Sequence, residues 1–365
     1  MLKPVQALRR TANQSLGVMV GIGTVILSVA ALGIGQPVFA PLFFALFIIA
    51  VAWPLQAWLD RWMPGLLALL VTVIAAIVLF GAFAFLISWA FSHVARYAVS
   101  ESAQFQVLYD RIAQWLAGHG VDVSSLWMDH FNTGWLLAAA QRVTTVLNSM
   151  LSFSLVVVIY VVIGLLEVEN TIARLRRMRD STLATILLTG GARVAAKFRR
   201  FMAVRTLMSL ITGLLVWGFV ALCGVPLARE WGIIAFAFNY IPVIGPALAT
   251  LFPTMFAIAQ FDSPQSAVFV FVVLNLIQFL VGSYMEPRVA GNVLAMSPFL
   301  VLLSVFFWTW LWGLGGAFIG VPIAIAILTL CDAHPASRWV NELLGSGPQE
   351  PATVPAAEQP ADHLA

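Results

Sequence analysis

The chain has 365 residues, of which 61% are hydrophobic and 10% charged, with a formal net charge of +3 and a mean hydropathy of +0.95. A soluble domain carries about 25% charged residues, so this composition excludes an ordinary water-soluble protein. Because about 20 apolar residues cross a bilayer as a helix, the long charge-free runs predict an all-α polytopic membrane protein with about eight transmembrane helices.

The N-terminal region, residues 1–91, is expected to hold three spans. The first charge-free run, 11–59, is long enough for two spans hinged near residues 33–37, and a third run covers 65–91. Arg9 and Arg10 precede the first run as they would in a signal peptide. Since that run continues into a second span without a visible cleavage site, we expect an uncleaved first span.

Residues 92–142 are expected to form an amphipathic helical segment on the outer side of the membrane. Phe105, Leu108, Ile112 and Leu116 recur at spacings of three and four among charged residues, which is typical of a helix with one apolar face. A fourth span follows at 143–166. Residues 167–205 then predict a basic cytoplasmic helical arm, whose cations form a solvated face that attracts anionic lipid head groups.

Residues 206–332 carry the remaining spans, and two charge-free runs there are broken by poor helix formers. The first, 231–261, contains Pro242, Gly245 and Pro246 in its middle, just after Asn239. The second, 289–331, contains a larger set of such residues: Gly291, Pro298, Gly313, Gly316 and Pro322.

Non-helical backbone at membrane depth is tolerated where protein or a water-filled cavity covers it, and transporters place solute sites at such breaks. A packing kink is the alternative. We expect broken or re-entrant helices whose free peptide groups face a solute, with Asn239 either capping a half-helix or contacting that solute.

The terminal segment, residues 333–365, ends in a proline-rich tail that is expected to be largely disordered, since it has little to bury. With eight spans both termini lie on one side. That side holds fourteen of the nineteen Lys and Arg residues and the other side five, with Arg205 on the first and Arg288 on the second. Positive charge stays cytoplasmic, so we expect both termini on the cytoplasmic side of the membrane. The net charge therefore reflects topology and indicates no nucleic-acid partner.

Signals for catalysis are absent from the sequence. No phosphate-binding loop of the form G-x-x-x-x-G-K-[ST] occurs. The five histidines lie outside the expected spans, so no metal site is predicted. The pair Gly316 and Gly320 favours close helix packing. Cys223 and Cys331 are expected at opposite membrane faces, where they cannot pair. We expect neither catalysis nor a cofactor.

Polar residues within the spans are candidates for a solute or ion pathway, because lipid cannot satisfy them. Asn275, Gln278, Gly282 and Glu286 follow at spacings of three and four and are expected to line one inward face. Glu286 is the best candidate for a proton- or cation-responsive group. The alternative is a structural ion pair with Arg288 at the outer interface.

A second stripe, formed by Arg205, Ser209 and Thr212, lies on the fifth span. Hydrogen bonds between helices, with an arginine that reaches the membrane surface, are the favoured interpretation there.

Four motifs resemble those of the AI-2E (autoinducer-2 exporter) family, also called PerM-like permeases. They are Asn239-Tyr-Ile-Pro-Val-Ile-Gly-Pro246, Glu286-Pro-Arg288-Val-Ala-Gly291-Asn292, Ser297-Pro298, and Trp312-Gly313-Leu-Gly-Gly316 followed by Pro322. Their order and spacing agree with the family over about residues 198–330. The resemblance implies an inner-membrane transporter that assembles as a homo-oligomer, with a pentamer as one candidate.

Three functions remain open at this point. The first is a secondary-type exporter of a small polar solute such as autoinducer-2, which suits amide and peptide groups. The second is a Na⁺(Li⁺)/H⁺ antiporter in which Glu286 exchanges a proton for an ion. The third is a membrane scaffold or regulatory subunit that transports nothing and binds partners through its outer segment and basic arm.

Overall fold

The computed structural model describes residues 19–101, 106, 114, 118, 133–178, 181–261, 263–291, 296–334 and 337–345. Within these ranges the chain is helical apart from turns and an isolated β-bridge between Met296 and Gly345. Six described helices are long and apolar enough to cross a membrane. The all-α multi-pass fold is therefore confirmed. The expected eight spans are not, because the helices Met19–Ile34 and Ile244–Gln260 are shorter than the others.

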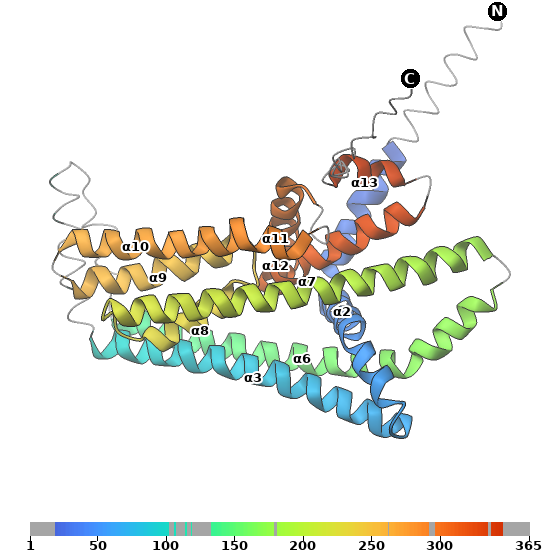
Figure 1. The fold of residues 1–365 in the computed structure, drawn as a ribbon, viewed down its shortest axis with the longest axis horizontal. Helices are drawn as coiled ribbons and strands as arrows, with labels where there is room; N and C mark the ends of the chain where they lie inside the picture. Colours follow the sequence, from blue (N-terminus) through green and yellow to red (C-terminus); the bar gives the residue numbers. More distant parts are fainter. Residues whose placement is uncertain are drawn as a thin grey trace, which may run out of the picture.

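Helices α3 (Gly65–Ser100) and α6 (Thr133–Arg176) run along one side of the bundle, and α2 (Gln36–Leu59) crosses it at a steep angle (Figure 1). A turn at Gly35 separates α2 from the helix Met19–Ile34, so the hinge expected near residues 33–37 is present. Phe105, Leu108, Ile112 and Leu116, which carry the amphipathic pattern, lie outside the described residues, as does the tail from residue 346.

Helix α7 (Ser181–Leu222) is the longest element of the second half, with 42 residues. At 1.5 Å per residue it is about 63 Å long, roughly twice the hydrocarbon thickness of a bilayer. The basic arm and the fifth span are therefore continuous in α7. Arg174, Arg176 and Arg177 lie where α6 ends and α7 is about to begin. We call this the arginine-rich end, and the end at Leu222 the opposite end.

The run 231–261 folds as a helical hairpin of α8 (Ala228–Phe238) and α9 (Ile244–Gln260). The ring of Trp231, in the first turn of α8, lies 4.9 Å from that of Phe256 near the end of α9. Gln260 donates a hydrogen bond of 3.0 Å to the carbonyl of Gly224. The two helices are therefore antiparallel, and both leave from the opposite end of the bundle. We call them the first hairpin.

The next span changes helix type along its length. α10 (Pro264–Phe279) runs into a π-helical segment, η1 (Leu280–Met285), and then into α11 (Glu286–Ala290). α11 stops at Gly291, whose φ of 54° favours glycine. Val204 and Met208 of α7 pack with Val281 and Ala290 in a buried cluster, so this composite helix runs alongside α7.

A second hairpin lies within α12 (Pro298–Ala333), whose two halves meet at the non-helical pair Trp312 and Gly313. The halves fold back on each other, because the backbone at Gly316 packs against the Trp308 carbonyl. Gly320 does the same against Ser304, where an added Cβ would lie 2.9 Å from the carbonyl oxygen. The expected close packing at these two glycines thus occurs within one hairpin.

The base of the second hairpin lies at the arginine-rich end. A Cβ added at Gly190, near the start of α7, would lie 3.1 Å from the side chain of Leu330. Helix α13 (Arg338–Leu344) returns the chain to this base, where the N–H of Ser297 donates to the carbonyl of Leu344 over 3.3 Å. The two hairpins therefore enter the bundle from opposite ends of α7 (Figure 1).

The tips of the two hairpins meet inside the bundle. The ring of Tyr240, at the first tip, stacks at 6.0 Å on that of Phe318 in the second hairpin. Tyr240 also donates to the hydroxyl of Thr206, which lies midway along α7 between Gly190 and Leu222. The tips thus lie near the middle of the long helices.

The outward faces of the long helices are apolar, as lipid contact requires. Large exposed apolar residues include Leu79, Phe85, Leu214, Val268 and Phe299. Cys223 and Cys331 are unpaired thiols in the described residues, near the bases of the first and the second hairpin respectively.

Candidate functional site

The tip of the first hairpin is a tight and strained turn. Pro242 and Gly245 are buried, and the backbone at Gly245 packs against the Phe238 carbonyl so closely that a Cβ would collide. Val243 has φ 67° and ψ −57°, and the N–H of Ile244 donates to the carbonyl of Pro242 over 2.8 Å. This geometry is a γ-turn of the rare positive-φ type, which a β-branched residue seldom adopts.

The break expected from the two prolines and the glycine therefore exists. Pro246 lies in the first turn of α9, where its missing N–H has no helical partner to lose. Pro242 lies in the turn that precedes this helix. Both prolines occupy positions that end one helix and begin another, which is why the chain turns back here.

Asn239 and Tyr240 fasten this tip to α7. The Asn239 side chain is buried and donates to the hydroxyl of Ser209 over 3.2 Å, and the Tyr240 hydroxyl donates to Thr206 over 3.0 Å. Asn239 is the residue that ends α8, but its amide bonds to α7 and not to the helix end. Ser209 thus does form the hydrogen bond between helices that was favoured for its stripe.

A buried ion pair joins α7 to α11 next to this tip. Arg205 donates from Nη1 to the Glu286 carboxylate over 2.9 Å, and both side chains are at least nine-tenths buried. The face of the Phe201 ring lies 5.9 Å from the guanidinium carbon. Arg205 was expected to reach the membrane surface, and this expectation is wrong, since the side chain is enclosed between helices.

The partner of Glu286 also differs from the expected one. Arg288 is exposed, and its guanidinium stacks at 3.6 Å on the ring of Tyr284. Arg205 and Arg288 were expected on opposite sides of the membrane, yet Glu286, two residues before Arg288, is in contact with Arg205. The reason is that α7 continues through the arm into the span, so that Arg205 lies far inside a helix that was assumed to end there.

The polar stripe on α10 and α11 is only partly inward. Gln278 and Glu286 are buried, whereas Asn275 and Gly282 are exposed, and Asn275 bonds to the carbonyl of Phe271 in its own helix. For Glu286 the cause is the π-helical turn that precedes it. A regular helix advances about 100° per residue, and the wider i→i+5 turn rotates the residues that follow. Glu286 is thereby brought back to the buried face.

We call the interface between α7 and the α10–α11 helix the seam. Three buried polar atoms along it have no hydrogen-bond partner among the described residues. They are Nε of Arg205, Oγ1 of Thr212 and Nε2 of Gln278. Arg205, Ser209 and Thr212 follow at helical spacing on one face of α7, and that face meets both Asn239 and Glu286. A polar surface thus lies between the first hairpin and the α10–α11 helix.

The tip of the second hairpin is held by an aromatic cluster. The Trp312 indole donates to the carbonyl of Leu32 over 3.0 Å, and the ring of Phe43 lies 5.5 Å away. Gly313 has φ 63° and ψ −147°, a conformation that is essentially restricted to glycine. Pro322 is buried in the second half of the hairpin.

The residues before the second hairpin shape its entry. Gly291 ends α11, and the Ser297 side chain accepts from the N–H of Leu300 as the N-cap of α12. Pro298 occupies the first turn, where proline is well tolerated. Gly291 and Pro298 therefore end and begin helices, whereas the break lies at Gly313. Asn292 lies outside the described residues.

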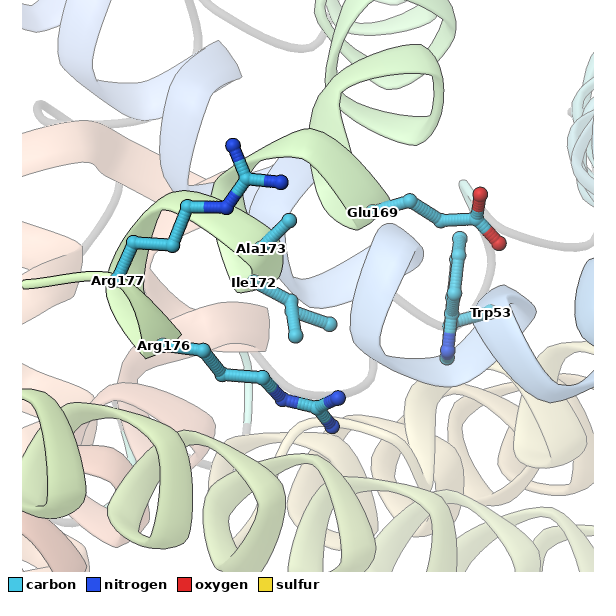
Figure 2. Close-up of a pocket in the computed structure, with 6 residues that line it drawn as sticks. All are labelled: Trp53, Glu169, Ile172, Ala173, Arg176 and Arg177. Atoms are coloured by element: carbon cyan, nitrogen blue, oxygen red, sulfur yellow. The ribbon is translucent and has the colours of Figure 1, made fainter.

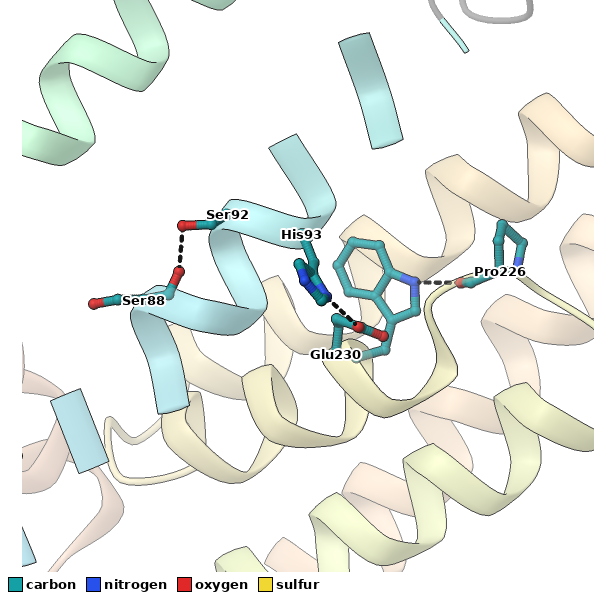
Figure 3. A network of polar contacts seen from close by, with 6 residues as sticks. Ser88, Ser92, His93, Pro226 and Glu230 are labelled. Carbon is teal, nitrogen blue, oxygen red and sulfur yellow. Dashed lines mark hydrogen bonds and ion pairs between the residues drawn. The ribbon is translucent and has the colours of Figure 1, made fainter. Parts of the chain in front are cut away.

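The base of the first hairpin carries a separate polar contact (Figure 3). His93 of α3 lies 2.9 Å from the carboxylate of Glu230, which is buried in the first turn of α8. The Trp89 ring lies 4.4 Å from that of His93, tilted by 50°. The contact anchors the hairpin base to α3, and no motif in the sequence pointed to it.

An open hollow of about 410 Å³ lies far from these motifs, between the end of α6 and α2 (Figure 2). Trp53 comes from α2, and the other lining residues belong to the end of α6: Glu169, Ile172, Ala173, Arg176 and Arg177. The expected attraction of this region for lipid head groups stays a prediction. The described residues contain no group of three or more metal-ligating side chains.

Sequence patterns identified both helix breaks but did not identify the partners in three contacts that build the site. Arg205 as the partner of Glu286, and Ser209 and Thr206 as the anchors of the first tip, come from a helix with no motif of its own. Their helical spacing was visible, but nothing in the sequence indicated which helix they face.

Comparison with known proteins gives consistent matches. The model of the AI-2E family transporter family matches residues 22–336. The AI-2 transport protein TqsA of Escherichia coli (strain K12) is 27% identical over 349 residues, which cover 94% of this chain and 98% of TqsA. The protein YhhT of the same organism is 30% identical over 203 residues, or 56% of this chain and 57% of YhhT.

Proposed function

Because the chain belongs to the AI-2E family of membrane transporters, we propose that it exports a small, uncharged polar solute such as autoinducer-2 by a secondary mechanism. TqsA, which is similar over nearly its whole length, is named as an AI-2 transport protein. Family membership makes the chain a transporter and not an enzyme. The solute and the direction of transport are the proposal.

The observation that carries the proposal is the meeting of two hairpin tips from opposite ends of the bundle. Discontinuous helices near the bilayer midplane are where secondary transporters hold their solutes. The first tip, at Tyr240, and the second hairpin, at Phe318, are in contact at the level of Thr206. A solute held at this level is separated from each membrane face by one hairpin, which suits access from alternate sides.

We propose further that both hairpins are re-entrant. At 1.5 Å per residue, the 11 residues of α8 reach only about 16 Å, roughly half of the hydrocarbon core. Each hairpin begins and ends at one end of the bundle, as a re-entrant segment must. The buried turn around Pro242 and the second hairpin's glycines are then covered by protein, which non-helical backbone at membrane depth requires.

Re-entrant hairpins also change the expected topology, and the new topology places more of the Lys and Arg residues on the cytoplasmic side. If the first hairpin does not cross, α11 ends on the cytoplasmic side, and Arg288 moves there with it. The count of Lys and Arg then changes from fourteen and five to fifteen and four. We propose on this ground that both termini face the cytoplasm. From the family membership we propose in addition a bacterial inner membrane and a homo-oligomeric assembly.

The pairing of Glu286 supports solute export over Na⁺(Li⁺)/H⁺ antiport. An exchanging carboxylate must release its partner at each cycle, and Arg205 holds Glu286 in a buried hydrogen bond of 2.9 Å. The opposing charges leave the seam without net charge, which suits an uncharged solute better than an ion. A scaffold without transport would not need two broken helices in contact at mid-depth.

The test is flux in proteoliposomes of known orientation. We expect the purified protein to move labelled autoinducer-2 and not ²²Na⁺. Liposomes that carry a variant with Gly245→Trp, which fills the first tip, are the inactive control. Flux of Na⁺ or Li⁺ without flux of autoinducer-2 would contradict the proposed function and favour the antiporter.

A further inference from the structure

We propose that Arg205, Thr212 and Gln278 bind the transported solute through hydrogen bonds, in the seam between α7 and α10. The inference rests on the proposed transport function and names the chemistry of its solute: an uncharged molecule rich in acceptor oxygens, such as a polyhydroxylated carbonyl compound. Of these three side chains, only Gln278 was favoured as a solute contact on sequence grounds alone.

The three residues lie along one antiparallel seam. Arg205 of α7 faces Glu286 of α11, and Met208 packs near Val281 in the same buried cluster. Because the two helices are antiparallel, residues further along α7 lie beside residues further back on α10. Thr212 therefore lies level with Gln278. The polar atoms without partners therefore follow one seam about two helical turns long.

These atoms are buried too deeply for water to satisfy them freely. Arg205 is 8% exposed, Thr212 0% and Gln278 9%. An unsatisfied buried polar group costs about 1–3 kcal/mol, so three of them in one seam are expensive if they serve packing alone. A bound solute whose oxygens accept these hydrogen bonds would remove that cost, which the protein bears only when no solute is bound.

The chemistry of the unpartnered atoms selects the solute. Nε of Arg205 and Nε2 of Gln278 carry only N–H groups, and the Thr212 hydroxyl can donate or accept. N–H groups cannot coordinate a metal cation, so Na⁺ does not fit. An anion does not fit well either, because the charge of Arg205 is already balanced by Glu286. A neutral acceptor such as a carbonyl or hydroxyl oxygen fits all three.

The seam is also coupled to the first hairpin. Ser209 lies between Arg205 and Thr212 on the same face of α7, and it holds the hairpin tip through Asn239. A solute bound to Arg205 and Thr212 would therefore lie next to the Ser209–Asn239 contact that fastens the tip. This places the binding groups beside the element that is proposed to cover the solute.

The experiment compares Thr212→Val and Gln278→Leu with the wild-type protein. Each variant keeps the approximate shape of the side chain and removes the unpartnered polar group. Thr212→Ser restores the hydroxyl. Thr329→Val is the matched control, because Thr329 is equally buried but its hydroxyl already bonds to the Ile325 carbonyl in its own helix.

Two measurements are made on detergent-purified and reconstituted protein. The first is the unfolding temperature with and without autoinducer-2, ribose, xylitol or NaCl. The second is the apparent KM for labelled autoinducer-2. A lost hydrogen bond of about 1 kcal/mol corresponds to roughly a five- to tenfold change in affinity. We expect at least one uncharged solute to stabilise the wild-type protein, and KM to rise about five- to tenfold in both variants but not in Thr212→Ser or Thr329→Val.

Without solute, both variants should unfold at the wild-type temperature or higher, since an unsatisfied polar group has been removed. The inference is overturned if the solute-induced shift survives unchanged in both variants, or if only NaCl stabilises the wild-type protein. It is also overturned if flux of autoinducer-2 continues with unchanged KM, a result that would leave the transport function itself intact. The thermal readout decides the inference even for a protein that moves no autoinducer-2.

Discussion

Arg205 and Glu286 are 81 positions apart in sequence, and their side chains meet at 2.9 Å in the interior of the bundle. The pair joins the middle of α7 to the short helix α11, immediately after the π-helical turn. It also fixes the depth of α11 beside the tip of the first hairpin. The first prediction follows from the burial of both charges.

Replacing one partner of this pair should destabilise the protein strongly. A buried charge left without its partner costs about 3–5 kcal/mol, so Glu286→Gln and Arg205→Met should each lower the unfolding temperature in detergent markedly. The double variant, with neither charge, should recover most of that loss.

The control for the pair is Arg288→Gln, because Arg288 is exposed and stacks only on Tyr284. Its unfolding temperature should stay close to that of the wild-type protein. If Glu286→Gln is as stable as Arg288→Gln, the two charges do not depend on each other as the structure implies.

Adding a methyl group at either hairpin should disturb it. A Cβ at Gly245 would collide with the Phe238 carbonyl, and one at Gly316 with the Trp308 carbonyl. Overpacking of this kind costs about 1–3 kcal/mol, so Gly245→Ala and Gly316→Ala should both unfold at lower temperature and lose flux.

Gly218→Ala is the matched control for these two variants, since a Cβ at Gly218 in α7 meets nothing within 4 Å. Alanine is the better helix former by about 1 kcal/mol, so this variant should be unchanged or slightly more stable. Equal stability of all three variants would show that the hairpins are less tightly folded than described.

Relieving the strain at the first tip should stabilise the protein and slow transport. Val243 has φ 67° in a γ-turn. Val243→Gly should gain about 1 kcal/mol, because removing about 1–3 kcal/mol of strain outweighs the 0.5–1 kcal/mol of added chain entropy. Denaturant unfolding in detergent measures the gain, and the maximal rate of flux measures the cost.

Leu227→Gly tests whether position matters, because Leu227 also has a positive φ, of 64°, but at the base of the same hairpin. We expect normal flux there but no comparable gain in stability, because Leu227 packs against the buried cluster around Trp231, whereas Val243 is exposed. Normal flux in Val243→Gly as well would mean that the strained turn has no part in transport.

The hollow at the arginine-rich end should retain anionic lipid. Arg176 and Arg177 line it together with Trp53, and a basic residue near the membrane surface contributes about 1 kcal/mol to the binding of anionic lipid. In nanodiscs of phosphatidylglycerol and phosphatidylcholine, the double variant Arg176→Gln with Arg177→Gln should keep fewer phosphatidylglycerol molecules in native mass spectra.

Arg229→Gln, an exposed arginine near the opposite end, is the control and should retain lipid as the wild-type protein does. Equal loss in both variants would point to a general effect of charge and not to the hollow.

The sequence alone determined the membrane class and the places where helices break. Both are local properties: charge-free runs set the class, and Pro242, Gly245 and Gly313 disrupt a helix wherever it packs. The burial of Gln278 and Glu286 was also correctly expected from their chemistry, because lipid cannot satisfy such groups.

Only the tertiary structure decided what those breaks produce and which groups meet. Hairpins that enter from opposite ends, and a charge pair between α7 and α11, depend on contacts between distant segments that no local pattern encodes. The π-helical turn shows the same limit on a smaller scale. One wider turn after Phe279 rotated Glu286 inward, because a helix advances about 100° with each residue and the faces of the residues that follow shift when the turn widens.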